Sequence, residues 1–562
     1  MNAAEAIVKI LEEKNVKYIF GHPGEQIIPF YSALNSSKIE HILMRHEQGA
    51  IHGADGYARV SGDFGVCIAT AGPGALNFTM GLATAYKDSV PMLVITGDNP
   101  NISATYDGFQ DVDIRSIFKS ITFKSFYPTD GKSAVENLKE AIEFLKKEPK
   151  GPIHINLPKD LLLDGNIGDS INDGGTYSTN FDYSQLNNAI IEIKNAKKPL
   201  ILAGAGIFWG KATDDLKKFV ETNNIPLVHT YHAKSIIGGF KMDLGLVGMR
   251  GTKMANYSFN NADLIIVLGS KLSERTTDTG GDFSVNKNGS SEFNNHETKF
   301  INVNIDEKSL FGDIKIHGDV RLVLRELNSL DKVTNSIDSS WHDEIQNHDE
   351  KFVINGLDSE TVPIKPQVAI KIILESFKDN FIVNDAGSHT TWVNLLSEKF
   401  SNEKLIFSGA MAPMGYGLPA SCGASVGIAK VGEIGGKIVL INGDGGFQMN
   451  IQELATIASL NLPILVVVLN NSQLGIIRQW EEIYSDELRY VVDLENPDFV
   501  KLANAYGIDG ETVDSKKGLE LVIDDLKLDK PYLLEILVDE EDIPLPWLRL
   551  INKMKFKIKR YE

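Results

Sequence analysis

The stretch Lys437-Ile438-Val439-Leu440-Ile441 is an apolar, β-branched run that leads within two residues into Gly443-Asp444-Gly445. An amphipathic segment follows from Phe447, so the glycines lie where a strand turns into a helix, as in a parallel α/β sheet. Glycine lets an anion approach the backbone closely, and the following helix offers the anion its positive end. The stretch therefore predicts an α/β fold with a phosphate-binding turn.

The same region contains oxygen ligands that suit Mg²⁺. The run that begins at Gly443 ends at Asn471, directly after the apolar strand expected over 464–469. Mg²⁺ prefers octahedral oxygen ligands and bridges one or two protein oxygens to substrate phosphates. Asp444 can supply a carboxylate, Asn471 a side-chain carbonyl and Gln473 a backbone carbonyl. A Gly-Asp-Gly alone is commonly only a turn, and the asparagine one strand later favours the metal site.

Length, composition and charge narrow the class of protein. A chain of 562 residues is too long for one core and predicts three or four structural units. The formal charge of -19 argues against a nucleic-acid partner, and no apolar run is long enough for a membrane helix. The N-terminus lacks the basic segment of a signal peptide. Cys67 and Cys422 have apolar, small neighbours, so we expect buried free thiols and a cytoplasmic protein.

Two polar stretches, 164–184 and 331–366, divide the chain and are predicted to be linkers. Between them, short β-branched runs alternate with helical patterns, which indicates parallel sheets with helices on both faces. We therefore expect an α/β protein with three doubly wound domains, at 1–165, 185–330 and 366–540, followed by a tail at 541–562.

The first and third domains resemble each other. Leu82-Ala83-Thr84 recurs as Leu454-Ala455-Thr456, and Gly72-Pro73-Gly74 recurs as Gly443-Asp444-Gly445 one residue out of step. A duplicated α/β unit explains the pattern, with coincidence in apolar sequence as the alternative. Because the first copy has proline in place of the aspartate, only the third domain is expected to hold the metal.

A glutamate stands at a predicted helix start in the first domain, within Arg45-His46-Glu47-Gln48-Gly49-Ala50. Favourable charge at the positive end of the helix dipole is sufficient to explain it. A catalytic role is the alternative.

Several motifs together resemble a known family. They are Gly21-His22-Pro23-Gly24, the glutamate motif just described, Asp55-Gly56-Tyr57-Ala58-Arg59, Gly72-Pro73-Gly74, Asp107-Gly108-Phe109-Gln110, 414–420, 443–450 and 474–480. On these motifs the chain resembles the thiamine diphosphate (ThDP) enzymes, and among them the acetohydroxyacid (acetolactate) synthases. The resemblance implies a pyrimidine-binding domain, a central Rossmann-like domain and a diphosphate-binding domain. It also implies a transferase that needs ThDP and Mg²⁺, decarboxylates pyruvate and ligates the hydroxyethyl unit to pyruvate or 2-oxobutanoate, for branched-chain amino acid synthesis. A ThDP-dependent decarboxylase or carboligase for another 2-oxo acid, or a non-catalytic nucleotide-binding protein, is the alternative.

The resemblance also implies residue roles. Glu47 would bind N1′ of the aminopyrimidine, and Phe109 and Gln110 would face the reaction centre. Met414 would support the bent cofactor, although a core residue is the alternative, and Trp480 would contact the second 2-oxo acid, although an edge residue is the alternative. The implied cofactor-binding set also includes Pro23, Asn77, Gly387, His389, Gly443, Asp444, Gly445, Gly446, Asn471, Gln473, Leu474 and Gly475. Since these residues come from two domains, the resemblance implies a homo-oligomer, dimer or tetramer, with active sites between subunits, and a regulatory small subunit as a further partner.

The central domain resembles the FAD-binding segments of these synthases. The implied contacts are Gly204, Gly206, Gly248, Gly251, Gly269, Arg275 and Asp306. Lys271-Leu272-Ser273-Glu274-Arg275 departs from the Arg-Phe-Asp-Asp-Arg of the family, and close helix–strand packing also explains Gly-Ala-Gly. FAD, an empty pocket and an ADP-like ligand therefore stay open. The Pro-Met-Val-Pro region of the synthases is replaced by Ile543-Pro544-Leu545-Pro546-Trp547, which leaves acceptor preference open.

Overall fold

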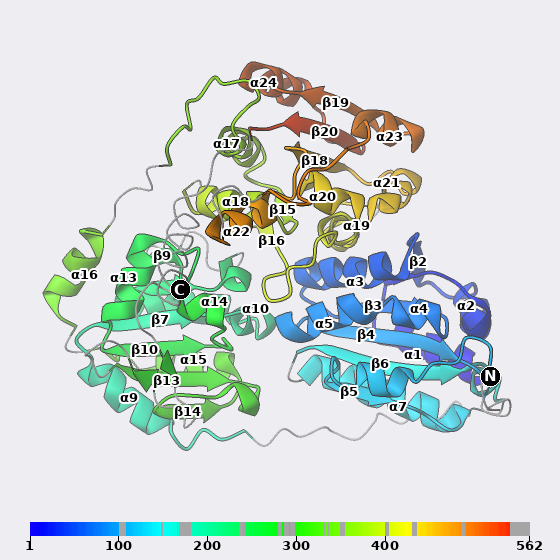
Figure 1. The fold of residues 1–562 in the computed structure, drawn as a ribbon. Coiled ribbons are helices and arrows are strands. Elements are labelled where there is room, and N and C mark those ends of the chain that lie inside the picture. Colours follow the sequence, from blue (N-terminus) through cyan, green and yellow to red (C-terminus); the bar gives the residue numbers. More distant parts are fainter. Residues whose placement is uncertain are drawn as a thin grey trace.

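The computed structural model describes residues 1–100, 108–147, 150–165, 167, 181–234, 240, 242–278, 284–285, 291–292, 298–330, 332–334, 337–348, 354–399, 404–429, 435–484 and 489–539. Within these residues, three six-stranded parallel sheets are covered by helices on both faces (Figure 1). This arrangement confirms the predicted fold class. The predicted tail at 541–562 and Asp107 lie outside the described residues.

The first sheet has the strand order β2-β1-β3-β4-β6-β5. Its strands are β1 (Tyr18–Gly21), β2 (Glu40–Leu43), β3 (Gly65–Ala69), β4 (Met92–Asp98), β5 (Lys124–Phe126) and β6 (Pro152–Pro158). Its helices are α1 (Ala3–Glu13), η1 (Glu25–Ile27), α2 (Ile28–Leu34), α3 (Glu47–Ser61), α4 (Pro73–Leu76), α5 (Thr79–Asp88), α6 (Ile114–Phe118), α7 (Gly131–Lys147) and α8 (Lys159–Leu162). Helices α1 and α7 cover one face, where their buried apolar residues share a core with the strands, and α3 and α5 cover the other.

The third sheet has the order β16-β15-β17-β18-β20-β19, which repeats the topology of the first. Its strands are β15 (Phe381–Asn384), β16 (Leu405–Ile406), β17 (Ile438–Gly443), β18 (Ile464–Asn470), β19 (Asp509–Val513) and β20 (Tyr532–Leu537). Its helices are α17 (Pro366–Ser376), α18 (His389–Lys399), α19 (Gly417–Gly427), α20 (Asp444–Gln448), η5 (Ile451–Glu453), α21 (Leu454–Ser459), α22 (Gly475–Tyr484), α23 (Phe499–Ala505) and α24 (Lys516–Asp525). The shared topology supports duplication over coincidence.

The middle sheet has the order β14-β13-β10-β7-β8-β9. Its strands are β7 (Pro199–Ala203), β8 (Leu227–His229), β9 (Asp243–Leu246), β10 (Leu264–Leu268), β13 (Lys299–Asn304) and β14 (Ile314–His317), with a separate hairpin of β11 (Ser284–Val285) and β12 (Ser291–Glu292). Its helices are α9 (Leu186–Asn195), α10 (Gly206–Trp209), α11 (Thr213–Asn223), η3 (Tyr231–Ala233), α13 (Lys253–Asn261), α14 (Glu274–Thr277), η4 (Glu307–Ser309) and α15 (Val320–Ser329).

The second predicted linker, 331–366, contains a helix, α16 (Ser339–Gln346), which corrects the prediction for this stretch. Trp341 and Ile345 are four residues apart, so both face the central sheet, and both are buried there. The Trp341 indole N–H donates to the carbonyl of Pro199 at 3.2 Å. The stretch is polar overall, but two buried apolar side chains are sufficient to pack a short helix against the central sheet.

Helix α3 of the first domain packs along α19 of the third (Figure 1). A Cβ at Gly56 would lie 2.1 Å from the carbonyl oxygen of Ala420, and one at Gly423 would lie 1.7 Å from that of Gly53. Only glycine therefore allows the two backbones to approach this closely. One apolar core continues across both helices and joins the two sheets.

The cysteines and the helices of the described residues bear on two predictions made for the whole chain. Cys67 and Cys422 are free and buried, as predicted. Within the described ranges, every helix is too short or too polar to cross a membrane.

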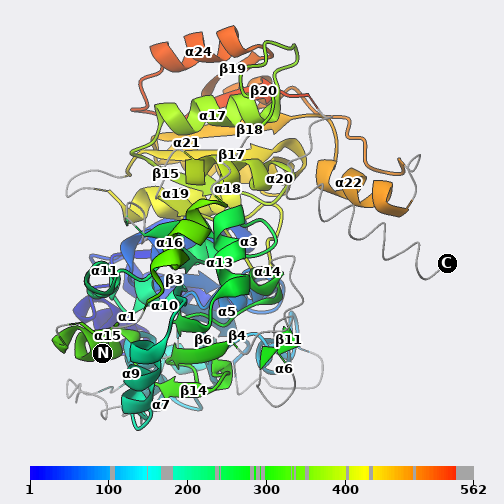
Figure 2. The same cartoon turned by 90° about the vertical axis from the view of Figure 1, so that its left-hand side faces the viewer.

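Figure 2 shows the third domain above the other two, with α22 projecting from its side.

Candidate active site

A cavity of about 290 Å³ opens at the carboxyl ends of the strands of the third sheet. Strand β17 ends at Gly443 and its parallel neighbour β18 at Asn470, with Gly443 opposite Leu469. The residues that follow the two strands, Asp444 and Asn471, therefore meet at one edge. The cavity brings together the following predicted residues: Gly387, His389, Met414, Gly443, Asp444, Gly445, Gly446, Asn471, Gln473, Leu474 and Gly475.

Asp444 is the charged oxygen donor of this cavity and is 2% exposed. Burial raises the pKa of its carboxyl, so the anionic form needs compensation. The Asn496 side-chain amide donates to Asp444 Oδ2 at 2.8 Å and to Asn470 Oδ1 at 2.9 Å, which fixes the carboxylate relative to β18. Asn496 was not predicted, because it lies beyond the helix that follows β18 and has no motif. With Asn471 and Gln473 beside it, Asp444 forms an oxygen-rich set that fits a Mg²⁺ ion.

Two buried polar atoms of the cavity wall fit a polar, hydrated ligand. Among the described residues, neither Nε2 of His389 nor Oε1 of Gln473 has a hydrogen-bond partner. Burial lowers the pKa of His389 to about 4, so the ring is neutral at pH 7 and offers one N–H and one acceptor. A buried polar atom without a partner costs about 1–3 kcal/mol, which a bound diphosphate or its hydration would relieve.

Arg250 lines the same cavity from the central domain. It follows β9, and its positive charge adds to the effect of burial in lowering the pKa of His389. In the sequence, Arg250 stands between Gly248 and Gly251, two of the glycines implied as FAD contacts. Its position in the cavity instead places a guanidinium, the side chain best suited to phosphate and carboxylate groups, beside His389.

Met414 belongs to the cavity and not to the core. It lines the cavity wall, and its Cε lies 3.3 Å from the position that a Cβ at Gly445 would take. The next residue, Gly415, donates its backbone N–H to Oδ2 of Asp385 at 2.9 Å. Asp385 is buried, and burial raises its pKa to about 6. The sequence offered only the place of Asp385 before the glycine turn at 387, not this contact.

The residues predicted around Glu47 form a second group, at the carboxyl ends of the strands of the first sheet. Oε2 of Glu47 accepts from the Asn77 side-chain amide at 2.9 Å. A Cβ at Gly74 would lie 3.2 Å from Oε1 of Glu47, and a Cβ at Gly72 would lie 2.4 Å from the carbonyl oxygen of Gln110. Glu47, Asn77 and Gln110 therefore surround the glycine turn of the first domain.

The other predicted residues of this group lie nearby. Gly24, next to the exposed Pro23, packs on Thr70, which also contacts Gly74. Phe109 is 77% exposed, and its carbonyl accepts from the Asn99 side-chain amide at 3.0 Å.

Among the described residues of one chain, the two groups do not meet. Among the described residues, the cavity of the third domain is lined by side chains of the second and third domains only. Trp480 also stays outside the cavity wall, whereas its neighbour Gln479 lines it. A site that needs both groups must therefore be completed by another chain or by a movement of this one.

The glycines predicted to contact FAD are used within the protein. Gly204 donates its N–H to Leu268, Gly206 to Gly269, Gly269 to Val303 and Gly251 to Gly248, each to a carbonyl, whereas Gly248 donates to Oδ1 of Asn256. Asp306 accepts from the N–H of Lys308 and the hydroxyl of Ser309, and Arg275 donates to Sδ of Met249. Backbone N–H groups that are already bonded cannot cradle a diphosphate, so close packing explains these glycines better.

Comparisons with known proteins agree with this geometry. Residues 1–117 match a family model described as the N-terminal TPP binding domain of thiamine pyrophosphate enzymes. Residues 186–327 match the central domain and residues 385–536 the C-terminal TPP binding domain of the same enzymes.

Relatives align over nearly the whole chain. A probable acetolactate synthase large subunit of Methanococcus aeolicus is 36% identical, over 96% of this chain and 92% of that protein. The acetolactate synthase large subunit of Lactococcus lactis is 36% identical, over 97% and 94%. The large subunit of acetolactate synthase isozyme 3 of Escherichia coli is 33% identical, over 92% and 91%.

Proposed function

The chain belongs to the thiamine pyrophosphate enzyme family, and from this premise we propose that it is an acetolactate synthase. The enzyme decarboxylates pyruvate and joins the remaining two-carbon unit to the carbonyl carbon of a second 2-oxo acid, pyruvate or 2-oxobutanoate. The observation that carries the proposal is the cavity in which Asp444, Asn471, His389 and Met414 converge, in a chain that aligns end to end with acetolactate synthase large subunits.

The residues of the cavity fit ThDP and Mg²⁺. Asp444, Asn471 and the Gln473 carbonyl would hold Mg²⁺ against the diphosphate, and neutral His389 would bond to a diphosphate oxygen. Arg250 lies on the same wall, and its positive charge would balance the negative charge of the diphosphate. ThDP, when bound, supplies a nucleophilic ring carbon and a sink for electrons.

Glu47 is proposed as the group that exchanges a proton with N1′ of the aminopyrimidine. Asn77 fixes one carboxylate oxygen, Oε2, and thereby orients the other. Gln110, which packs against the glycine turn at Gly72, is proposed to orient the carbonyl of the 2-oxo acid. Phe109 and Trp480 are proposed to form the apolar side of the acceptor pocket, which distinguishes one methylene by about 1–3 kcal/mol.

The active site is proposed to lie between two subunits. Since the described lining of the cavity contains no residue of the first domain, the partner subunit's Glu47 would complete it. A homodimer is then the smallest active unit, and a homotetramer would contain two such pairs. The relatives are named large subunits, which supports a small regulatory subunit as a further partner.

FAD binding and a cytoplasmic location are two further proposals. FAD binding in the central domain is tested by the absorbance of the purified protein, and the internally bonded glycines favour a colourless one. A cytoplasmic location is supported by the two free buried cysteines.

The test is incubation of the protein with pyruvate, ThDP and Mg²⁺, followed by identification of the products. We expect one 2-acetolactate and one CO₂ for every two pyruvate molecules consumed. Acetaldehyde as the main product would replace the proposal with a decarboxylase. Lack of ThDP uptake in calorimetry, in the presence of Mg²⁺, would point to a protein without this chemistry. Asp444→Ala serves as the inactive control, because it removes the charged metal ligand.

A further inference from the structure

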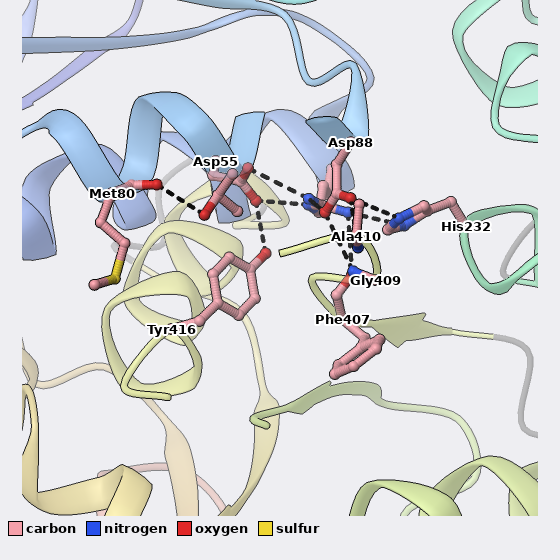
Figure 3. Close-up of polar contacts among 10 residues, drawn as sticks. Asp55, Met80, Asp88, His232, Phe407, Gly409, Ala410 and Tyr416 are labelled. Carbon is pink, nitrogen blue, oxygen red and sulfur yellow. Dashed lines mark hydrogen bonds and ion pairs between the residues drawn. The ribbon is translucent and has the colours of Figure 1, made fainter. Parts of the chain in front are cut away.

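A buried charged cluster lies where the three domains meet, outside the site described above (Figure 3). Its centre is Arg59 of α3, whose Nε donates to Oδ1 of Asp55 at 2.6 Å and whose NH2 donates to Oδ2 of Asp88 at 2.8 Å. Asp88 ends helix α5, and its side chain is fully buried. Tyr416 of the third domain donates its hydroxyl to Oδ1 of Asp55 at 2.6 Å, and His232 comes from the central domain.

Asp88 binds the backbone of the segment 407–416, which connects β16 to α19. Its Oδ1 accepts from the N–H of Ala410 at 2.9 Å and its Oδ2 from the N–H of Gly409 at 3.2 Å. Arg59 reinforces this contact by donating to the carbonyl of Phe407 at 3.1 Å. One carboxylate of the first domain thus fixes the start of a segment of the third domain.

The segment 407–416 is part of the wall of the cofactor cavity. Phe407, Ala412 and Met414 all line the cavity. The backbone of Ala412 is in the left-handed region, with φ of 47°, a conformation that a residue with a side chain adopts only when its neighbours impose it. At the far end of the segment, the contact of Tyr416 with Asp55 supplies a second attachment to the first domain.

The tautomer of His232 follows from its two partners. Because a guanidinium only donates, Nδ1 of His232 must accept from NH1 of Arg59, 3.0 Å away. Nε2 then carries a proton, lies 3.2 Å from Oδ1 of Asp88 and donates to it. Burial would raise the pKa of Asp88, but the contacts with His232 and Arg59 hold it well below its usual range. Asp88 is therefore a carboxylate that four donors, from three domains, keep in one orientation.

We propose that Asp88 is a positioning residue for the cofactor: it sets the segment 407–416 so that Met414 and Ala412 face the ThDP cavity. The inference rests on the proposed function, because the ligand of that cavity is taken to be ThDP. Asp88 touches neither the cavity nor the reacting atoms, and acts through two backbone N–H groups. The first domain thereby sets the shape of a cavity that it does not line.

The test compares Asp88→Asn with Asp243→Asn in the full-length protein. Both changes neutralise a carboxylate beside a histidine. Asp88 is fully buried and lies 3.2 Å from His232, and Asp243, whose side chain is 16% exposed, lies 3.8 Å from His229. Asp243 accepts from the N–H of Gly245 and faces His229, and both of these partners belong to the central domain. Calorimetry with ThDP at saturating Mg²⁺ should show about a tenfold higher Kd for Asp88→Asn and less than a threefold change for Asp243→Asn, at similar losses of thermal stability.

A double-mutant cycle separates positioning from general destabilisation. If Asp88 acts through Met414, Asp88→Asn should weaken ThDP binding less than threefold when Met414 is already alanine. Losses that multiply in the double variant, or unchanged affinity in Asp88→Asn, would overturn the inference. Wild-type protein that binds no ThDP would remove the proposed function as well, so the two failures are distinguishable.

A second variant covers the case in which Asp88→Asn does not fold. Tyr416→Phe removes one hydroxyl from the other end of the segment and leaves the ring packing intact. We expect a smaller rise in the ThDP Kd in the same direction. An unchanged Kd in this variant would refute the attachment of the segment to the first domain as a determinant of cofactor binding.

Discussion

The proposed division of the active site between two chains can be tested by mixing two inactive variants. Glu47→Gln removes the carboxylate of the first-domain group and keeps an oxygen for the Asn77 amide, so the fold should survive. Asp444→Asn removes the charge of the proposed metal ligand of the third domain and keeps the size of a buried side chain. Each variant alone should lose at least about a hundredfold in kcat, the usual range for a positioned acid–base group or a metal ligand.

The expected magnitude for the mixture follows from where the two groups lie. If each site combines Glu47 of one subunit with Asp444 of the other, a mixed dimer has one site with both residues intact and one site with neither. Random pairing of equal amounts makes about half of the dimers mixed, and each has one working site of two. Activity should therefore return to about a quarter of the wild-type value.

The assay is acetolactate formation from pyruvate after the two variants are expressed together with different affinity tags. Sequential purification on both tags isolates the mixed dimer, whose activity should be about half that of the wild type. If both groups acted within one chain, every chain would contain one defect. A mixed dimer with no more activity than the two variants alone would therefore refute the intersubunit site.

Three further predictions concern the metal, the cavity wall and the buried histidines. A chelator should abolish activity, and added Mg²⁺ should restore it. The Asp444→Asn variant should stay inactive at any Mg²⁺ concentration. If Mg²⁺ restored its activity, Asp444 would not be the charged ligand. Arg250→Ala should raise the Kd of ThDP about tenfold, a loss of about 1.4 kcal/mol of binding free energy, and Arg250→Lys should raise it less. If calorimetry gave the same affinity for the variants and the wild type, Arg250 would not reach the diphosphate. Burial lowers the pKa of His52 to about 4 and that of His154 to about 3, so both rings are neutral in the fold and take up protons on unfolding. Their contribution to the free energy of unfolding is complete above the unfolded pKa of about 6.5. Below that pH it declines by about 1.4 kcal/mol per pH unit for each ring, and the decline ends near pH 4 for His52 and near pH 3 for His154. Urea unfolding between pH 7 and pH 5 should show this decline, and a shallower one in His154→Phe; equal slopes would contradict the assignment.

Sequence predicted the parts of the site that depend on strand ends. Two apolar runs, ending at Gly443 and Asn470, had to pair in parallel, and that pairing alone places Asp444 beside Asn471. The resemblance between the first and third domains likewise foretold their shared sheet topology. Periodicity and turn chemistry determine such features locally, so they can be deduced without coordinates.

Contacts between distant segments could not be deduced in this way. Asn496 and Asp88 lie outside any motif, and Arg250 lies in a segment that predicted a different ligand. Their partners are hundreds of residues away or beyond an intervening loop. In the same way, sequence does not distinguish a glycine that meets a ligand from one that meets a backbone, as at Gly206. Polar composition also hid α16, because two side chains, Trp341 and Ile345, decide its docking.

The glycine contact between α3 and α19 limits which substitutions the gene for this protein can tolerate. At Gly56 and Gly423, a carbonyl oxygen already occupies the space of the smallest possible side chain. A single extra methyl would force the two helices apart and disturb the turn from Arg45 to Gln48, whose first two N–H groups bond to Glu453 of the third domain and which contains the proposed catalytic glutamate. We expect alleles with alanine at either position to behave as loss-of-function mutations, although neither residue meets a ligand.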